Sequence, residues 1–339
     1  MDERLPWHQH PWQQLQRRLA AGRLPHALLL AGPAGLGKLA FARRMAQALL
    51  CETPDAGGDA CGRCRSCRLF RAGNHPDYAA VRPAEEGKVI KIDQIRDLRA
   101  FFGHTAQYGG YKIALLEPAD HLNDNAANGL LKTLEEPPGD SLLLLVTARP
   151  ARLPATVRSR CQKVRFDRPS PEVAVPWLAA RAGGAAGPEA LLDVAGGAPL
   201  VALAYAGGDR WRRRGELVDC YEQVQAGRLD PIRAAECWTQ GDLVESLRWL
   251  IGWHTDLIRL KMSPEPPRLS NPDLRSVLRR WADRHSPRGL FDRLDAAVRL
   301  HGLCATTQVN AQLLLEAFLC DAAGDDPSGV PRGRAFEEG

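Results

Sequence analysis

The stretch Ala31-Gly32-Pro33-Ala34-Gly35-Leu36-Gly37-Lys38-Leu39 decides the fold of the first half of this 339-residue chain. It follows a short apolar run, residues 27–30, and opens a helical pattern over residues 39–50. A strand, a glycine-rich loop and a helix in this order are the context of a phosphate-binding loop. The candidate phosphate-binding residues are Gly32, Gly35, Gly37 and Lys38. The next position needs Ser or Thr to bind magnesium, and the alkyl side chain of Leu39 cannot do so.

A second defect lies in another segment. In P-loop ATPases a further strand ends in Asp, which orients magnesium, and a Glu that activates water often follows it. The matching strand here is 112–116, and the two positions hold Glu117 and Pro118. Proline has no group that can polarise water, so the sequence predicts a nucleotide-site frame that does not hydrolyse ATP.

Composition describes an ordinary globular protein with an uneven charge. Hydrophobic residues make up 45% and charged residues 25% of the chain. No apolar run approaches the roughly 18 residues of a membrane span, and the first residues do not form a signal peptide, so we expect a cytoplasmic protein. The net charge is +5, but residues 1–165 hold 24 Lys and Arg against 16 Asp and Glu. This excess suits an anionic partner such as nucleic acid or a nucleotide.

The pattern of elements changes once along the chain. Residues 1–166 alternate strands and helices, which predicts a parallel sheet covered on both faces. The predicted strands are 27–30, 78–81, 112–116, 142–147 and 163–166, and the predicted helices are 39–50, 93–102, 124–135 and 154–159. Residues 167–207 predict two or three short helices, and residues 208–322 a bundle of about five or six. The tail, 323–339, is predicted to be disordered. The fold class is therefore α/β followed by all-α.

Four of the nine cysteines form a cluster, Cys51, Cys61, Cys64 and Cys67. The Cys-x-x-Cys spacing supplies adjacent corners of a tetrahedral metal site, and four thiolates leave no position for water. We therefore predict one structural Zn²⁺ per chain. An iron–sulfur cluster and free structural thiols are the alternatives.

Two segments carry a family resemblance. They are residues 128–138, Asn-Gly-Leu-Leu-Lys-Thr-Leu-Glu-Glu-Pro-Pro, and residues 156–162, which contain Ser159-Arg160-Cys161. Together with the four-cysteine insertion after the P-loop helix, they resemble the AAA+ clamp-loader subunits of the bacterial replicative DNA polymerase over roughly residues 4–322. The resemblance implies a P-loop AAA+ sheet domain with a zinc-binding insertion (1–166), a small helical lid (167–207) and a helical collar for oligomerisation (208–322).

The resemblance also implies a role. The motor subunits of this family, gamma and tau, keep an intact P-loop and an Asp-Glu pair, from which this chain departs at Leu39, Glu117 and Pro118. The lid position that offers an arginine to the nucleotide is Leu200 here. The implied function is an ATPase-inactive scaffold in the DNA polymerase III holoenzyme that helps load the sliding clamp on primed DNA. Arg160 would act as an arginine finger on ATP bound by a neighbouring subunit.

The implied partners are the gamma or tau subunits and a delta subunit in a hetero-pentameric ring, within the cytoplasmic, nucleoid-associated replisome. Two alternatives stay open. One is a self-sufficient AAA+ ATPase that uses Lys38, Glu117 and an unusual metal geometry. The other is a zinc-dependent DNA-binding module, which Arg63, Arg65 and Arg68 around the cysteine loop would permit.

Overall fold

The computed structural model describes residues 4–85, 88–108, 110–184, 186–306 and 309–323. The chain forms two compact units, Met1–Val173 and Ala174–Gly339. The predicted division into three domains, with boundaries at 166 and 207, stays a prediction. The predicted disordered tail lies, from residue 324 onward, outside the described residues.

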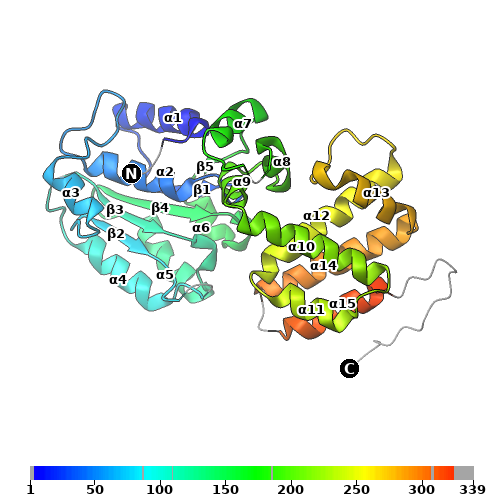
Figure 1. The fold of residues 1–339 in the computed structure, drawn as a ribbon. Helices are drawn as coiled ribbons and strands as arrows, with labels where there is room; N and C mark the ends of the chain where they lie inside the picture. Colours follow the sequence, from blue (N-terminus) through cyan, green and yellow to red (C-terminus); the bar gives the residue numbers. More distant parts are fainter. Residues whose placement is uncertain (1–3, 86–87, 109, 185, 307–308, 324–339) are drawn as a thin grey trace. The chain divides into compact units, whose positions relative to one another are not determined.

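Unit 1 is built on a five-stranded parallel sheet in the order β2-β3-β4-β1-β5 (Figure 1). The strands are β1 (Ala27–Ala31), β2 (Tyr78–Val81), β3 (Lys112–Leu116), β4 (Ser141–Thr147) and β5 (Gln162–Arg165). Each lies within one residue of its predicted position, so the predicted parallel sheet is confirmed. β1, β3 and β4 are buried along their whole length, as expected for strands covered on both faces.

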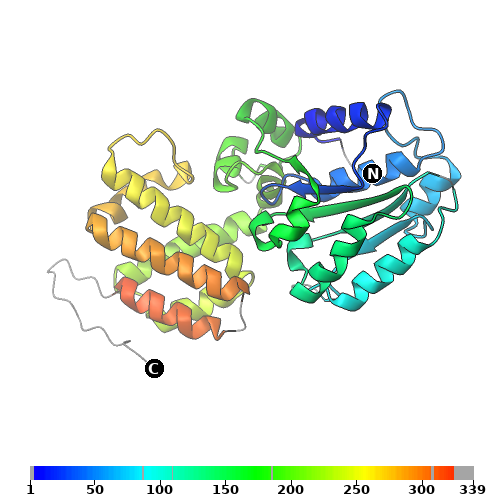
Figure 2. The same ribbon diagram turned by 180° about the vertical axis from the view of Figure 1, so that it is seen from behind.

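Helices cover both faces of the sheet, as Figures 1 and 2 show. One face carries α1 (Gln9–Ala20) and α2 (Lys38–Leu50), and the other carries α4 (Ile92–Gly103) and α5 (Asp124–Glu135). Three aromatic rings pack edge to face here. The Phe41 ring of α2 lies 5.8 Å from the Trp12 ring of α1 and 5.0 Å from the Phe166 ring, measured between centroids. These rings fix the start of the chain, the P-loop helix and the end of β5 in one cluster.

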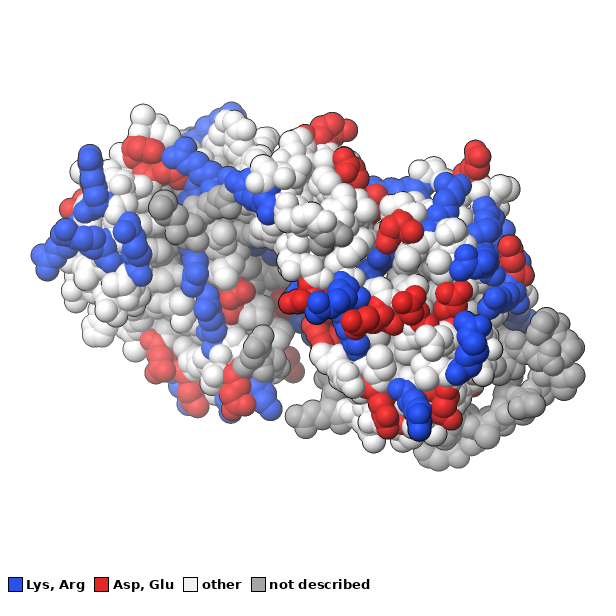
Figure 3. All heavy atoms as spheres, in the orientation of Figure 1, with Lys and Arg blue, Asp and Glu red and all other residues white. Residues whose placement is uncertain are grey.

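The surface of unit 1 is basic. Residues 1–173 hold 25 Lys and Arg against 18 Asp and Glu. Figure 3 shows blue side chains gathered at the end of this unit that carries α3 (Arg65–Arg71), a helix in the cysteine module that the sequence reading did not predict.

Unit 2 is all-α in the part of the chain that the structure describes. Its helices are α7 (Pro171–Ala179, which starts in unit 1), α8 (Pro188–Val194), α9 (Pro199–Ala206), α10 (Asp209–Gln225), α11 (Pro231–Thr239), α12 (Leu243–Met262), α13 (Arg275–Asp283), α14 (Pro287–Thr306) and α15 (Ala311–Ala323). The predicted change from α/β to all-α is confirmed. No single described helix has the length and apolar character to cross a membrane, and only the bent pair α8 and α9 passes that test jointly.

An aromatic cluster forms the core of the α10–α15 bundle. Tyr221, Trp238, Trp253 and Trp281 are fully buried, with neighbouring ring centroids 5.3 to 6.4 Å apart. His254 lies beside them, and its Nε2 is 3.3 Å from the Tyr221 hydroxyl. Burial lowers the pKa of His254 from 6.5 to about 3, and the charges of Arg293 and His285 act in the same direction.

This buried histidine makes the bundle acid-sensitive. The unfolded chain binds a proton at His254 near pH 6.5, whereas the folded chain binds it only near pH 3, so the free energy of unfolding falls as pH decreases through this window. We expect His254→Gln to lessen the loss between pH 6.5 and 3. Urea unfolding at several pH values measures it, with exposed His104→Gln as the control. Identical pH profiles for the wild type and His254→Gln would contradict the assignment.

Candidate nucleotide site, arginine finger and cysteine module

The predicted phosphate-binding loop has the backbone geometry that its glycines allow. Gly35 and Gly37 have φ values of 74° and 77°, in the left-handed region that favours glycine. Gly32 lies directly against the carbonyl oxygen of Phe166, so a side chain there would collide with the backbone after β5. The loop thus joins β1 to α2 in the form that the sequence predicts.

The Lys38 side chain is bound by its own loop. Its Nζ donates a hydrogen bond to the Pro33 carbonyl oxygen at 2.6 Å, and its side chain is 6% exposed. Burial lowers the pKa of Lys38, while the negative charges of Asp120 and Glu117 oppose that effect. The lysine therefore satisfies a carbonyl of its own loop, and the half-buried Leu39 follows it in the first turn of α2.

The N-terminal segment covers the same loop. The Leu36 carbonyl oxygen accepts hydrogen bonds from Trp7 Nε1 at 3.0 Å and from His8 Nε2 at 2.7 Å, and the Leu36 side chain is fully buried. Since a carbonyl only accepts, His8 carries its proton on Nε2. Burial lowers the pKa of His8 to about 4, so the ring stays neutral. Leu5 and His8 also press against Gly37.

These N-terminal residues could not be identified as loop contacts from the sequence. Trp7 and His8 lie 29 and 28 positions from Leu36, and nothing in their immediate neighbours marks them as loop contacts.

The acidic residue at the end of β3, where magnesium would bind, pairs with an arginine instead. Glu117 follows β3 and forms an ion pair with Arg82 at 3.4 Å. Pro118, at the position predicted for a water-activating residue, follows Glu117 directly.

A second carboxylate near Lys38, Asp120, was not predicted as a site residue. It accepts hydrogen bonds from Thr147 Oγ1 at 2.7 Å and Arg149 Nε at 2.9 Å. Burial acts to raise the pKa of Asp120, but these hydrogen bonds and the charge of Arg149 outweigh it and hold the pKa below its usual value. Both carboxylate oxygens thus have protein partners. Thr147 ends β4, so this clamp joins the ends of two adjacent strands.

Arg160 lies just after α6 (Ala155–Ser159) with its side chain 37% exposed. Its guanidinium forms an ion pair with Glu135 at 2.6 Å and donates to the Thr156 carbonyl oxygen at 3.1 Å. The neighbouring Cys161 points into the core, where burial raises its pKa to about 12. Cys161 therefore anchors the segment, and Arg160 reaches the surface.

The lid position singled out in the sequence, Leu200, is the second residue of α9 in unit 2. It carries an apolar side chain that is half-buried.

The four cysteines come together. Their sulfur atoms lie within 4.8 Å of one another, and Cys51 Sγ and Cys64 Sγ are 3.9 Å apart. Four sulfurs at about 2.3 Å from a tetrahedral zinc are spaced about 3.8 Å apart. Backbone N–H groups of Cys61, Cys64 and Cys67 donate to the preceding cysteine sulfurs at 3.2 to 3.4 Å. The donor set and spacing fit a metal ion.

A buried polar chain joins this module to the sheet. Ser66, beside Cys67 in α3, lies 2.9 Å from His75 Nε2, and His75 Nδ1 accepts from the Asp77 backbone N–H at 3.0 Å. The proton must therefore sit on Nε2, so the imidazole cannot act as a base toward the serine. The Asp77 carboxylate binds the N–H groups of Gln107 and Tyr108 and lies 3.5 Å from Lys112 Nζ. These three residues, Ser66, His75 and Asp77, therefore have a structural role: they connect α3 to the edge of the sheet, and we call them the Ser66–His75–Asp77 brace.

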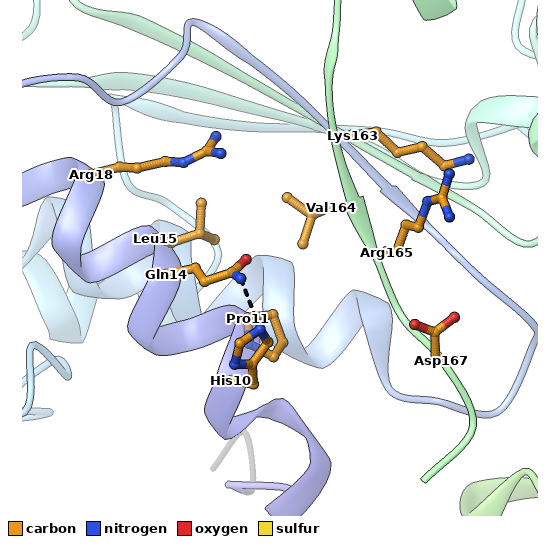
Figure 4. A pocket seen from close by; sticks show the side chains of 9 residues that line it. All are labelled: His10, Pro11, Gln14, Leu15, Arg18, Lys163, Val164, Arg165 and Asp167. Atoms are coloured by element: carbon orange, nitrogen blue, oxygen red, sulfur yellow. Dashed lines mark hydrogen bonds between the residues drawn. The ribbon is translucent and has the colours of Figure 1, made fainter.

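A separate surface pocket of about 290 Å³ lies between α1 and β5. Figure 4 shows Lys163 and Arg165 together on one side and Arg18 on the other, with Leu15 and Val164 between them. None of the residues predicted for nucleotide, metal or finger roles lines this pocket.

The family of the chain follows from comparison with known proteins. The family model described as DNA polymerase III, delta subunit, matches residues 7–170, and the model described as DNA polymerase III, delta subunit, C terminal, matches residues 208–323. DNA polymerase III subunit delta' of Pseudomonas aeruginosa is 38% identical over 317 residues, covering 93% of this chain and 95% of that protein.

Two Escherichia coli proteins are also similar. DNA polymerase III subunit delta' is 33% identical over 319 residues, covering 93% of each chain. DNA polymerase III subunit tau is 37% identical over 153 residues, covering 45% of this chain and 23% of that protein. The two delta' relatives span nearly the whole chain, and on that ground the chain belongs to the delta' subunit family of the DNA polymerase III clamp loader.

Proposed function

We propose that this chain is the subunit of the clamp loader that does not hydrolyse ATP itself and supplies Arg160 to ATP bound on a neighbouring subunit. The observation that carries the proposal is the contrast between two basic side chains. Lys38 is buried and donates to its own loop, whereas Arg160 is exposed at the end of α6.

Several features of the chain's own site support the absence of hydrolysis. The loop lacks a hydroxyl at Leu39, the strand end lacks a water activator at Pro118, and the Leu36 carbonyl is covered by Trp7 and His8. A nucleotide phosphate would have to break the Lys38 bond to Pro33 and would find no magnesium ligand on the next residue.

Arg160 has the chemistry of a finger. A guanidinium is always charged, and its planar donors suit the oxygens of a transferring phosphoryl group. Its present partner, Glu135, is half exposed, and an exposed ion pair contributes only about 0–1 kcal/mol. Arg160 can therefore exchange Glu135 for a stronger phosphate partner supplied by an adjacent subunit.

The remaining features fit a place in a larger assembly. We propose that gamma or tau and delta subunits join this chain in a hetero-pentameric ring that loads the sliding clamp on primed DNA in the cytoplasm, at the replisome. Residues 167–207 would serve as the lid and residues 208–322 as the collar. The cysteine module would hold one structural Zn²⁺ through Cys51, Cys61, Cys64 and Cys67.

Because the site lacks both a magnesium ligand and a water activator, we expect Leu39→Thr alone to create no ATPase activity. The new hydroxyl supplies a magnesium ligand, but Pro118 still cannot activate water. Phosphate release by the purified variant measures this, with the wild-type chain as the matched control. Steady turnover by Leu39→Thr would show that the second defect has been misjudged.

For the finger, we expect Arg160→Ala to leave the fold intact and to slow the ATP site it serves by roughly 10³-fold or more. The ATP hydrolysis rate of the reconstituted loader should fall to the rate that its remaining ATP sites provide. The control is Arg158→Ala, which removes an exposed arginine from the same helix, α6. Loader turnover that is the same with Arg160→Ala as with the wild type would remove the finger role.

For the metal, we expect about one zinc per purified chain, lost on Cys64→Ser substitution together with thermal stability of unit 1. Cys320→Ser, at an exposed cysteine outside the module, is the matched control and should keep the zinc. Elemental analysis and thermal unfolding check both outcomes. A metal-free wild-type chain of unchanged stability, or one that contains iron, would contradict the zinc assignment.

A further inference from the structure

One basic surface has no part in the proposed function. Four arginines lie on and beside α3, within nine residues of one another, and all four are exposed. They are Arg63, Arg65, Arg68 and Arg71, called here the α3 arginine patch. The opposite side of the helix carries the buried Ser66 and Cys67, so the patch is the outer surface of the cysteine module.

The acids near this patch are too few to neutralise it. Glu52 lies beside α3, and its carboxylate accepts a hydrogen bond from the Ser66 backbone N–H at 3.0 Å. The sequence has no Asp or Glu between Asp59 and Asp77. Asp59 pairs with Arg44 at 2.5 Å and Arg4 at 2.7 Å, and Asp77 is fully buried against backbone N–H groups and Lys112. Among the described residues, no arginine of the patch lies within ion-pair distance of a carboxylate. Zinc with four thiolates carries about −2 and Glu52 a further −1, which still leaves the four guanidiniums in excess.

The patch is held rigidly. The Ser66–His75–Asp77 brace ties α3 to the sheet, and the sulfur atoms of Cys64 and Cys67 belong to the close cysteine set. Arg71 donates to the Gly62 carbonyl oxygen at 2.5 Å, and the Arg65 guanidinium lies 5.7 Å from the Tyr108 ring. Arg63 and Arg68 have no such contact in the described part of the chain. A fixed platform lowers the ordering cost of binding an extended anion.

The chemistry of the patch favours a phosphate backbone over a protein partner. Protein interfaces have an apolar centre with aromatic or aliphatic anchors. Residues 51–76 contribute no exposed large hydrophobic side chain, and the exposed side chains of α3 itself are arginines. Arginines three residues apart on a helix are neighbours, and each can bind phosphate oxygens through two parallel hydrogen bonds.

We propose that the α3 arginine patch binds the phosphate backbone of duplex DNA without reading its sequence. Such contacts need no recognition helix in a groove, because they use charge and donor geometry alone. The site is separate from Arg160, and it does not depend on the ATPase role of the chain.

The test measures the affinity of the full-length chain for a short labelled duplex of mixed sequence, over a series of salt concentrations. Arg63→Gln with Arg68→Gln removes two phosphate contacts. The slope of log K against log salt should become less steep by about 1 to 2, and affinity at about 0.1 M salt should fall roughly ten- to hundredfold. Arg63→Lys with Arg68→Lys should keep most of the slope.

The matched control is Arg228→Gln with Arg233→Gln, which removes the same charge from exposed positions of unit 2. Unchanged zinc content and unfolding temperature show that the Arg63 and Arg68 variant is folded. Wild-type affinity and slope in that variant, or an equal loss in the control, would overturn the proposal. So would preference for a single strand over the duplex, unmeasurable binding by the wild type at low salt, or a defect confined to assembly with other loader subunits.

Discussion

The hydrogen bond from Lys38 to the carbonyl oxygen of Pro33 is the contact on which the proposed lack of ATP hydrolysis depends most. A phosphate-binding lysine is useful only when it can turn toward an anion. Here it is buried in its own loop, while Trp7 and His8 donate hydrogen bonds to the Leu36 carbonyl oxygen. Because His8 stays neutral to about pH 4, the cover carries no positive charge that would attract a phosphate. The glycine-rich frame has become a packing element between β1, α2 and the start of the chain.

The same domain also presents Arg160, which lies on the surface just after α6. In the proposed function, the local site lacks a hydroxyl at Leu39 and a water activator at Pro118, whereas Cys161 anchors the segment that presents Arg160. Glu135 holds that arginine in a weak, solvent-screened pair. Under the proposed function, an arginine held in this form can serve a nucleotide bound by another subunit.

Much of this could be predicted from local sequence. The strands were predictable because buried parallel strands such as β3 and β4 form short, nearly continuous apolar runs. The cysteine cluster was predictable from the Cys-x-x-Cys spacing. Contacts between distant residues could not be predicted. His8 meets Leu36, Asp120 meets Thr147 and Arg149, and Glu135 meets Arg160 only after the sheet has formed. Helix α3 escaped prediction because seven residues are too few for a periodic apolar pattern.

The central claim is that the chain's own lysine takes no part in catalysis. The most direct measurement is ATP hydrolysis by the purified chain alone, with magnesium and primed DNA present, comparing the wild type with Lys38→Ala. The account predicts the same background rate for both proteins. Sustained turnover by the wild type that disappears with Lys38→Ala would contradict it.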